Sequence, residues 1–380
     1  RFSGNQDNGT WGTDSGNENG YEFLTGGDGF RIAIEPGNNP VFYTEYQYGN
    51  MYRHINGSIQ FINTKPPGQY NWNTPIVIDP FTPTTIYSGA QSVVKSTDRG
   101  QTWTTISPSL IGDNPEFGNL PFNTIYSLAV SPLDNNVIWA GLDNGKVWVT
   151  TNGGDDWADL SDFFPNRWVS SVLPDPVDAE SAYLTFSGFR WNEDESHVFH
   201  LNLADGVPTD IGLSLPDVPV NEIIIDTSTM DLFLATDVGV YQSTDNGDSW
   251  EVFGMGMPAI VVSDLTLHED SRMLFAGTYG RSMFATQLDE PSAVSDLTSI
   301  EQLAIYPNPS NGNFKVAMSL SKSAVLNLRL FSLNGRLVAD LGERSFGAGE
   351  QEWAVRLGGV PAGNYVVRLG DSWSGKLVIQ

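Results

Sequence analysis

The sequence predicts an all-β protein, in which a series of repeated sheets is followed by a small terminal sandwich. Its 380 residues include 39 Gly and 22 Pro, and only 17% are charged, a balance typical of short strands joined by turns. A glycine-containing octapeptide that ends in tryptophan occurs three times. Residues 1–303 carry 11 Lys and Arg against 40 Asp and Glu, whereas residues 304–380 carry 8 against 5. This change in charge predicts a domain boundary.

The octapeptide belongs to a longer repeat. "PIVIDPFTPTTIYSGAQSVVKSTDRGQTW" aligns with "IYSLAVSPLDNNVIWAGLDNGKVWVTTNGGDDW" and with "VNEIIIDTSTMDLFLATDVGVYQSTDNGDSW". Each copy contains three short apolar strands, then the octapeptide, then a fourth strand. A period of about 40–50 residues with four strands is typical of a β-propeller blade. We therefore expect a multi-bladed β-propeller over residues 1–288, with about six blades and a partial N-terminal unit.

The ends of this region bear on how the ring closes. Because the chain starts at Arg1 within strand-and-turn sequence, we expect it to be a fragment of a larger propeller. The last copy of the repeat, at 262–288, stops before its octapeptide and so lacks an outer strand. The N-terminal unit is a candidate to supply that strand, since an unpaired edge is an aggregation liability.

The octapeptide itself predicts a hairpin between the third and fourth strands. An Asp accepts hydrogen bonds from the turn's own N–H groups, a Gly permits a positive φ, and a Ser offers a second local bond. The tryptophan packs back as an apolar staple, which contributes roughly 2–3 kcal/mol. We expect this structural role for Ser96, Asp98, Gly100, Trp103, Asn152, Gly154, Trp157, Ser243, Asp245, Gly247 and Trp250.

These octapeptides resemble the Asp-box, or bacterial neuraminidase repeat. Two of the three fit S-x-D-x-G-x-[ST]-W at every position, and the third departs at Thr150, Asn152 and Asp156. The phrases "GGDGFRIAIEP", "YTEYQYGNMYR" and "AGTYGRSMF" are most similar to the large sortilin-like propellers of exported bacterial proteins. The resemblance covers about residues 1–288 and implies the fold rather than an activity.

The last eighty residues predict a second domain. Residues 289–303 are polar and lack alternation, so they are interpreted as a linker. Residues 304–380 contain about seven short strands, with an Asn334–Gly335 turn of the kind preferred in tight hairpins. This pattern predicts a small immunoglobulin-like β-sandwich.

Four motifs in this domain, "YPNPSNGNFKV", "LFSLNGRLV", "AGNYVVRL" and "GKLVIQ", resemble the type A sorting domain of the type IX secretion system. The residues that carry the resemblance are Tyr306, Pro307, Asn308, Pro309, Gly312, Phe314, Asn334, Gly335, Gly363, Tyr365 and Lys376. The resemblance implies that a Gram-negative bacterium exports the chain through the periplasm to the cell surface or beyond. It also implies that the outer-membrane export machinery is the partner of residues 304–380, with cleavage in the linker.

Candidate catalytic residues are few. "LATDVGVYQ" resembles the segment that carries an aspartate in family 74 xyloglucanases, which nominates Asp237. Asp28 and Glu45 are other carboxylates at blade ends, but a glycosidase needs two carboxylates at a defined separation. "FRIAIEP" only loosely matches the sialidase F-R-I-P signature, because Ala33 replaces the proline. We therefore expect a binding protein, with a polysaccharide-degrading glycoside hydrolase as the alternative.

Other ligand classes are constrained by composition. The acidic propeller region would repel phosphate backbones, so no nucleic-acid partner is expected. There is no Cys and no apolar run long enough to span a membrane. His197 and His200 should point to opposite faces of a strand, so no metal site is expected there. Acidic loops at 14–22 and 191–196 could hold calcium, although no cofactor is required. Tyr46, Tyr48, Tyr52, Trp72 and Trp191 are candidates for a sugar- or peptide-binding platform.

Overall fold

The computed structural model describes residues 1–13, 20–37, 41–112, 122–188, 195–254, 256–289, 300–320, 324–332, 337–369 and 373–380. The chain divides into two units, Arg1–Leu288 and Asp289–Gln380. The first, here called the propeller unit, is a β-propeller, and the second, here called the sorting unit, is a β-sandwich. The described residues contain strands and two short 3₁₀ turns, Ser161–Phe163 and Glu269–Ser271.

Five four-stranded antiparallel sheets make up most of the propeller unit. The first two are β4 (Gly29–Ile34), β5 (Phe42–Tyr46), β6 (Asn50–Ile55), β7 (Ser58–Ile62) and β8 (Ile76–Ile78), β9 (Ile86–Gly89), β10 (Val93–Ser96), β11 (Thr104–Thr105). The next is β12 (Ile125–Val130), β13 (Ile138–Leu142), β14 (Val147–Thr150), β15 (Ala158–Asp159). The last two are β16 (Val169–Pro174), β17 (Ser181–Phe186), β18 (Val198–Asn202), β19 (Thr209–Asp210) and β20 (Val220–Asp226), β21 (Asp231–Thr236), β22 (Gly239–Ser243), β23 (Glu251–Phe253).

Two three-stranded sheets complete the set found in the described residues. They are β1 (Phe2–Asn5), β2 (Gly9–Gly12), β3 (Glu22–Thr25) and β24 (Val262–His268), β25 (Met273–Thr278), β26 (Met283–Gln287). The N-terminal unit therefore forms a sheet of its own, and among the described residues β26 pairs only with β25. The expectation that it supplies the outer strand of the last blade is wrong, because β1 to β3 pair with one another.

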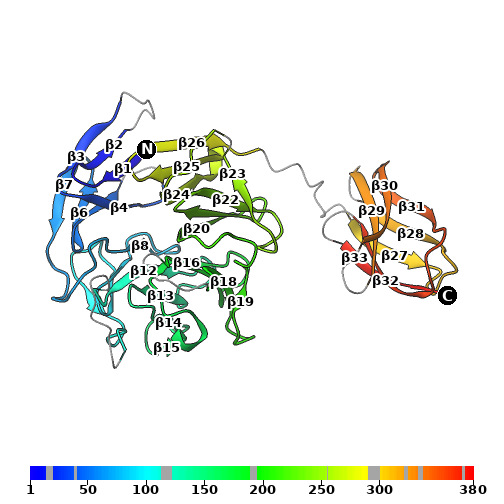
Figure 1. Ribbon diagram of the computed structural model, residues 1–380, viewed down its shortest axis with the longest axis horizontal. Helices are drawn as coiled ribbons and strands as arrows, with labels where there is room; N and C mark the ends of the chain where they lie inside the picture. The colour runs from blue at the N-terminus through cyan, green and yellow to red at the C-terminus, as the bar shows by residue number, and fades with distance from the viewer. Residues whose placement is uncertain are drawn as a thin grey trace. The chain divides into compact units, whose positions relative to one another are not determined.

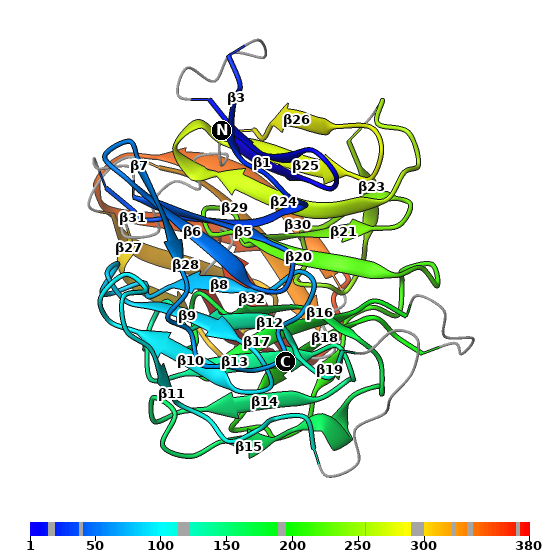
Figure 2. The same ribbon diagram turned by 90° about the vertical axis from the view of Figure 1, so that its left-hand side faces the viewer.

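The N-terminal sheet lies between the last sheet and the β4–β7 sheet. The Arg1 guanidinium lies 5.1 Å from the centre of the Phe275 ring of β25, and the rings of Phe2 and Phe42 lie 4.8 Å apart. Figure 1 shows the first strands β4, β12, β16, β20 and β24 toward the centre of the ring. In Figure 2 the order β12, β13, β14, β15 runs from the centre toward the edge. The first strand of a sheet thus places its residues near the propeller axis.

A β-bulge recurs in the first strand of five sheets. The register shifts between Gly29 and Ile32 in β4, and directly before Ser127 in β12, Ser171 in β16, Glu222 in β20 and Asp264 in β24. A bulge bends a strand and redirects its side chains. Residues at this position are therefore equivalent around the axis.

Apolar clusters between neighbouring sheets form the core of the propeller unit. Each cluster joins one sheet to the next, as where Trp139 and Val147 of one sheet pack with Val169 and Leu184 of the following one. A buried acid after the first strand adds a polar link between sheets. Asp226 pairs with Arg272 of the next sheet at 2.7 Å and 3.1 Å.

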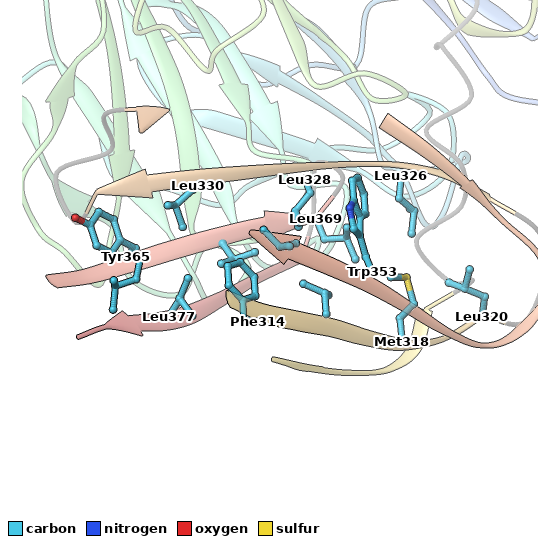
Figure 3. Packing of buried hydrophobic residues seen from close by; sticks show 14 residues of the cluster. Phe314, Met318, Leu320, Leu326, Leu328, Leu330, Trp353, Tyr365, Leu369 and Leu377 are labelled. Carbon is cyan, nitrogen blue, oxygen red and sulfur yellow. The ribbon is translucent and has the colours of Figure 1, made fainter. Parts of the chain in front are cut away.

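The sorting unit contains two packed sheets. One is β27 (Ile300–Tyr306), β28 (Asn313–Leu320) and β31 (Gly349–Arg356), and the other is β30 (Leu337–Phe346), β29 (Ala324–Ser332), β32 (Gly363–Leu369) and β33 (Trp373–Ile379). Alternate residues of β28 are buried, as expected for a half-exposed strand. Figure 3 shows that Phe314, Trp353 and Leu328 point into one shared core.

Candidate functional site

Two of the octapeptide corners, Ser96–Trp103 and Ser243–Trp250, share most of their hydrogen bonds. Asp98 Oδ1 accepts from Ser96 Oγ (2.8 Å) and from the Thr102 backbone N–H (2.8 Å), and Gly100 N–H donates to Ser96 Oγ. Burial opposes the ionisation of Asp98, but bonds from Thr102, Ser96 and Gln101 outweigh it and lower its pKa to about 2. Asp245 accepts from Ser243 and Ser249 in the same way. In both corners the carboxylate therefore accepts hydrogen bonds from groups of its own turn.

The third corner, Thr150–Trp157, has the same shape, but its carboxylate lies at the seventh position, Asp156, instead of the third. Asn152 Oδ1 accepts from Thr150 Oγ1 (2.9 Å) and from Asp156 N–H (2.9 Å), while Asn152 Nδ2 donates to the Asp156 carboxylate at 3.1 Å. In the other corners a hydroxyl donates to an acid, whereas here an amide donates to an acid four residues later. Both arrangements satisfy the turn.

The tryptophans link two of these corners to the preceding sheet. Trp157 Nε1 donates to Ile106 O (2.9 Å) and Trp250 Nε1 to Ile211 O (2.7 Å), whereas Trp103 Nε1 donates within its own turn to Gly100 O (3.2 Å). Gly100 and Gly247 have φ of 82° and 91°, a region that favours glycine. The corners thus face backbone and apolar side chains and present no group arranged for chemistry.

Asp237 lies in the turn between β21 and β22 and is half-buried. Its carboxylate accepts from Asn221 Nδ2 at 2.9 Å, and its N–H donates to Pro219 O at 3.1 Å. Asp143 occupies the same turn in the β12–β15 sheet and accepts from the N–H groups of Phe122 and Thr124. Asp237 therefore makes hydrogen bonds that hold a turn, as Asp143 does in the corresponding turn of another sheet.

The other two sequence candidates, Asp28 and Glu45, are buried. Asp28 accepts from Asp7 N–H and Gln47 Nε2, both at 2.6 Å. Glu45 is 1% exposed, and its Oε1 accepts from Gly49 N–H at 3.0 Å, while Oε2 has no hydrogen-bond partner among the described residues. Burial raises the pKa of Glu45 to about 8 against the bonds from Gly49 and Thr74.

The histidines and acidic loops give no metal centre among the described residues. His197 contacts Asp217 at 3.1 Å, whereas His200 faces Asp175 at 3.4 Å. No group of three or more acids or histidines positioned for a metal ion occurs in the described part of the chain. Most of the two acidic loops, at 14–19 and 191–194, and Trp191 lie outside the described residues.

The remaining aromatic candidates fall into two groups. Tyr46 and Tyr52 stack with ring centroids 5.7 Å apart, and Phe61 lies 5.3 Å from Tyr52. We call Tyr46, Tyr52 and Phe61 the aromatic strip. Separately, Tyr48 and Trp72 meet edge to face at 5.0 Å. The candidate set is therefore split, and only the strip extends across three strands of one sheet.

Near the propeller axis, Arg31, Glu222 and Asp264 form a charged group that sequence reasoning missed; we call it the axial cluster. Arg31 lies 5.7 Å from the centre of the Tyr126 ring, which itself meets Trp168 edge to face at 5.0 Å. Burial lowers the pKa of Arg31, but Tyr126, Glu222 and Asp264 outweigh it and raise that pKa. Charged residues in the otherwise apolar "FRIAI" and "VNEIII" were the available signal.

The two acids of the axial cluster hold protons more tightly than usual. Burial and then the charge of Asp264 raise the pKa of Glu222 to about 8, and burial raises the pKa of Asp264 although Arg31 opposes it. Asp264 is exposed to solvent and Glu222 is half-buried. Both carboxyl groups are therefore reachable from solvent.

In the sorting unit, the first and last sequence motifs meet. Asn308 Nδ2 donates to Lys376 O (2.6 Å), and Asn308 Oδ1 accepts from Val378 N–H (2.9 Å). Ser310 N–H donates to Val378 O, and Gln380 N–H to Ser310 O, each at 2.8 Å. The chain end is therefore bound to the "PNPS" segment.

Other motif residues shape the same sandwich. Phe314 is buried in the core, Gly312 has a φ of 94°, and Tyr365 Oη donates to Pro361 O at 2.8 Å. Tyr306, which is 42% exposed, hydrogen bonds to Glu352. The Asn334–Gly335 turn lies outside the described residues.

The two units differ in what comparison with known proteins shows for each. Residues 304–380 match the family model of the secretion system C-terminal sorting domain. No curated protein matches the sequence. The sorting unit marks the chain as cargo that the type IX secretion machinery exports to the cell surface or the extracellular space. No helix in the described residues is long and apolar enough to cross a membrane.

Solved structures similar to this chain are β-propeller proteins. A GH74 xyloglucanase from Xanthomonas campestris has a TM-score of 0.60 at 13% identity, covering 84% of this chain and 56% of that chain. A GH74 enzyme from Niastella koreensis has a TM-score of 0.58 at 15% identity, covering 84% and 55%. PorZ, a surface component of the type IX secretion system of Porphyromonas gingivalis, has a TM-score of 0.51 at 15% identity, covering 94% and 53%. The chain thus spans about half the length of these proteins, and the similarity shows the fold.

Proposed function

We propose that the exported propeller unit is a glycan-binding module that acts at or outside the cell surface, and that the aromatic strip is its contact. The supporting observation is a face of the β4–β7 sheet that the neighbouring sheet covers only in part. Phe2 of β1 packs on Phe42 near the inner end of this face. Farther out, Phe61 is 45% exposed and Ile59 is 51% exposed.

The three-stranded N-terminal sheet lies beside this face. Thr44, Tyr52 and Phe61 are paired across β5, β6 and β7, so their side chains share one face. Within the described residues the N-terminal sheet has three strands, whereas the β4–β7 sheet has four. Phe61, in the last strand of the larger sheet, stays exposed, while Tyr46 and Tyr52 are half-buried.

The chemistry of the strip suits sugars. Tyrosine has a rigid apolar face and a hydroxyl that can bond to a ligand hydroxyl. The rings of Tyr46 and Tyr52 lie nearly parallel, with an interplanar angle of 25°. A flat surface of this kind matches the apolar face of a pyranose ring, whereas a protein hot spot is usually a desolvated pocket.

The alternative function, a glycoside hydrolase of the xyloglucanase kind, draws on the sequence resemblance around Asp237. Such a reaction needs a second carboxyl group roughly 5–9.5 Å away. The carboxylate of Asp237 is bonded to Asn221 in a turn like that of Asp143. This arrangement favours a structural role for Asp237.

Binding of the full chain to immobilised polysaccharides and a glycan array tests the proposal. We expect retention without release of reducing sugar, and at least tenfold weaker binding by Tyr52→Ala and Phe61→Ala. Tyr279→Ala is the matched control, since Tyr279 is also an exposed aromatic, at 70%, but lies after β25 of the last sheet. Retention of protein ligands alone, or reducing sugar release that Asp237→Ala abolishes, would overturn the proposal.

A further inference from the structure

The axial cluster is separate from the aromatic strip. The link between sheets that its Glu222 makes is one that a smaller residue can also make. Glu222 Oε2 accepts from Leu265 N–H of the next sheet at 2.5 Å. At the equivalent position of β12, Ser127 Oγ accepts from Val172 N–H of its own neighbour at 2.9 Å. A serine therefore makes the same link between sheets, and the carboxylate adds a charge that this link does not need.

Arg31 lies near the axis because its neighbours come from several sheets. It belongs to β4, yet its guanidinium is near Tyr126 of β12, two sheets away. It is also coupled electrostatically to Glu222 of β20 and Asp264 of β24, as well as to Glu45 of its own sheet. A side chain can approach strands from four sheets only where the sheets converge.

The opposite charges of the axial cluster do not close on each other. Within the described residues, no ion pair of 4.0 Å or less joins Arg31 to Glu222 or Asp264. Arg31 Nε is shielded from solvent and has no hydrogen-bond partner among those residues. A buried polar group without a partner is costly. The fold thus holds a guanidinium and a carboxyl pair near each other without a direct contact.

The carboxyl pair can exchange its proton for a cation. Burial and then the charge of Asp264 raise the pKa of Glu222, and burial raises the pKa of Asp264 although Arg31 opposes it. Among the described residues, Arg31 is a charged group coupled to both acids, and Thr266 Oγ1 lies 3.5 Å from Asp264. An ammonium group bonded to both carboxylates would stabilise their ionised forms and so favour loss of a proton.

We propose that the axial cluster binds a small zwitterion, whose carboxylate pairs with Arg31 and whose ammonium group bonds to Glu222 and Asp264. Such a ligand supplies an anion for the unpartnered guanidinium and a cation for the acids, and it adds no net charge to an acidic protein. The edge-to-face pair Tyr126 and Trp168 lies beside Arg31 and offers apolar surface to the carbon chain that separates the charges.

Isothermal titration of the full chain with glycine, 4-aminobutyrate and 6-aminohexanoate at pH 7 tests this inference. At least one of these should bind at least tenfold more tightly than butylamine or butyrate, which carry only one of the two charges. Titration in two buffers of different ionisation enthalpy should show release of protons on binding, because the ammonium favours the ionised carboxylates.

Two variants assign the charges. Arg31→Met should weaken binding at least tenfold, and Glu222→Ser should do so while also removing the proton release. Serine is the natural residue at this position in β12 and β16, so Glu222→Ser should keep the link to Leu265 and the fold, which circular dichroism checks. Asp98→Asn, at an octapeptide corner away from the cluster, should bind as the parent does. Absence of binding by all three zwitterions, equal binding of butylamine, or unchanged binding by Arg31→Met would overturn the proposal.

Discussion

The corners Ser243–Trp250 and Thr150–Trp157 have one shape and two distributions of charge. In the first, a carboxylate at the third position accepts from Ser249 Oγ at 2.6 Å, and in the second, an amide at that position donates to Asp156 at 3.1 Å. Both tryptophans donate to a carbonyl of the preceding sheet. The comparison teaches that the turn requires a donor and an acceptor four residues apart, while their order is free.

Removal of a tryptophan staple should have the largest effect. Trp250 is 8% exposed and sits in a cluster between two sheets, whereas Trp157 is half-buried. We expect Trp250→Ala to lower the free energy of unfolding by about 3–5 kcal/mol and Trp157→Ala by less. Urea denaturation followed by circular dichroism measures both. Trp250→Phe, which loses the bond to Ile211 but keeps a smaller aromatic ring, should cost less than Trp250→Ala. Equal losses for the two alanine variants would contradict the importance of burial.

Changes at the third corner should separate charge from shape. Asn152→Asp places a second carboxylate beside Asp156, and we expect it to cost less than about 1 kcal/mol because the site is exposed. Adding Asp156→Thr gives the third and seventh positions the residue types of Ser96–Trp103, with Thr150 in place of Ser, and should restore the lost stability. Urea denaturation at pH 7 measures both. If the double variant were less stable than the single one, the two corners would not be interchangeable.

The smallest effect is a difference in pH dependence. The pKa of Asp98 is lowered to about 2 by its hydrogen bonds, and that of Asp245 is also lowered. A folded-state pKa below the unfolded value stabilises the protein above about pH 4, and this stability is lost as pH falls toward 2. Asp98→Asn with Asp245→Asn should therefore flatten the loss of stability between pH 4 and 2. Thermal denaturation at each pH measures the change, and identical slopes for parent and variant would refute it.

The repeat made the corners predictable because the interactions are local. Gly100 donates to Ser96 and Thr102 donates to Asp98 within one turn, so the spacing along the chain reports the geometry directly. The same holds for the alternation of β28 in the sorting unit. The axial cluster was not identified, because Arg31 lies far from Glu222 and Asp264 in the sequence and approaches them only where the first strands converge.

The sequence alone determined the structural repeat, which consists of short strands, a closed turn and an aromatic staple. It also determined the sorting domain that follows the repeats and directs export. These features depend on contacts within some fifty residues, which a linear pattern encodes. The tertiary structure decided that the N-terminal strands form a sheet of their own, that Phe61 of the aromatic strip stays exposed, and that Arg31 approaches the acids of β20 and β24. The physical reason is that ring closure brings together residues whose separation in the chain carries no information about their distance in space.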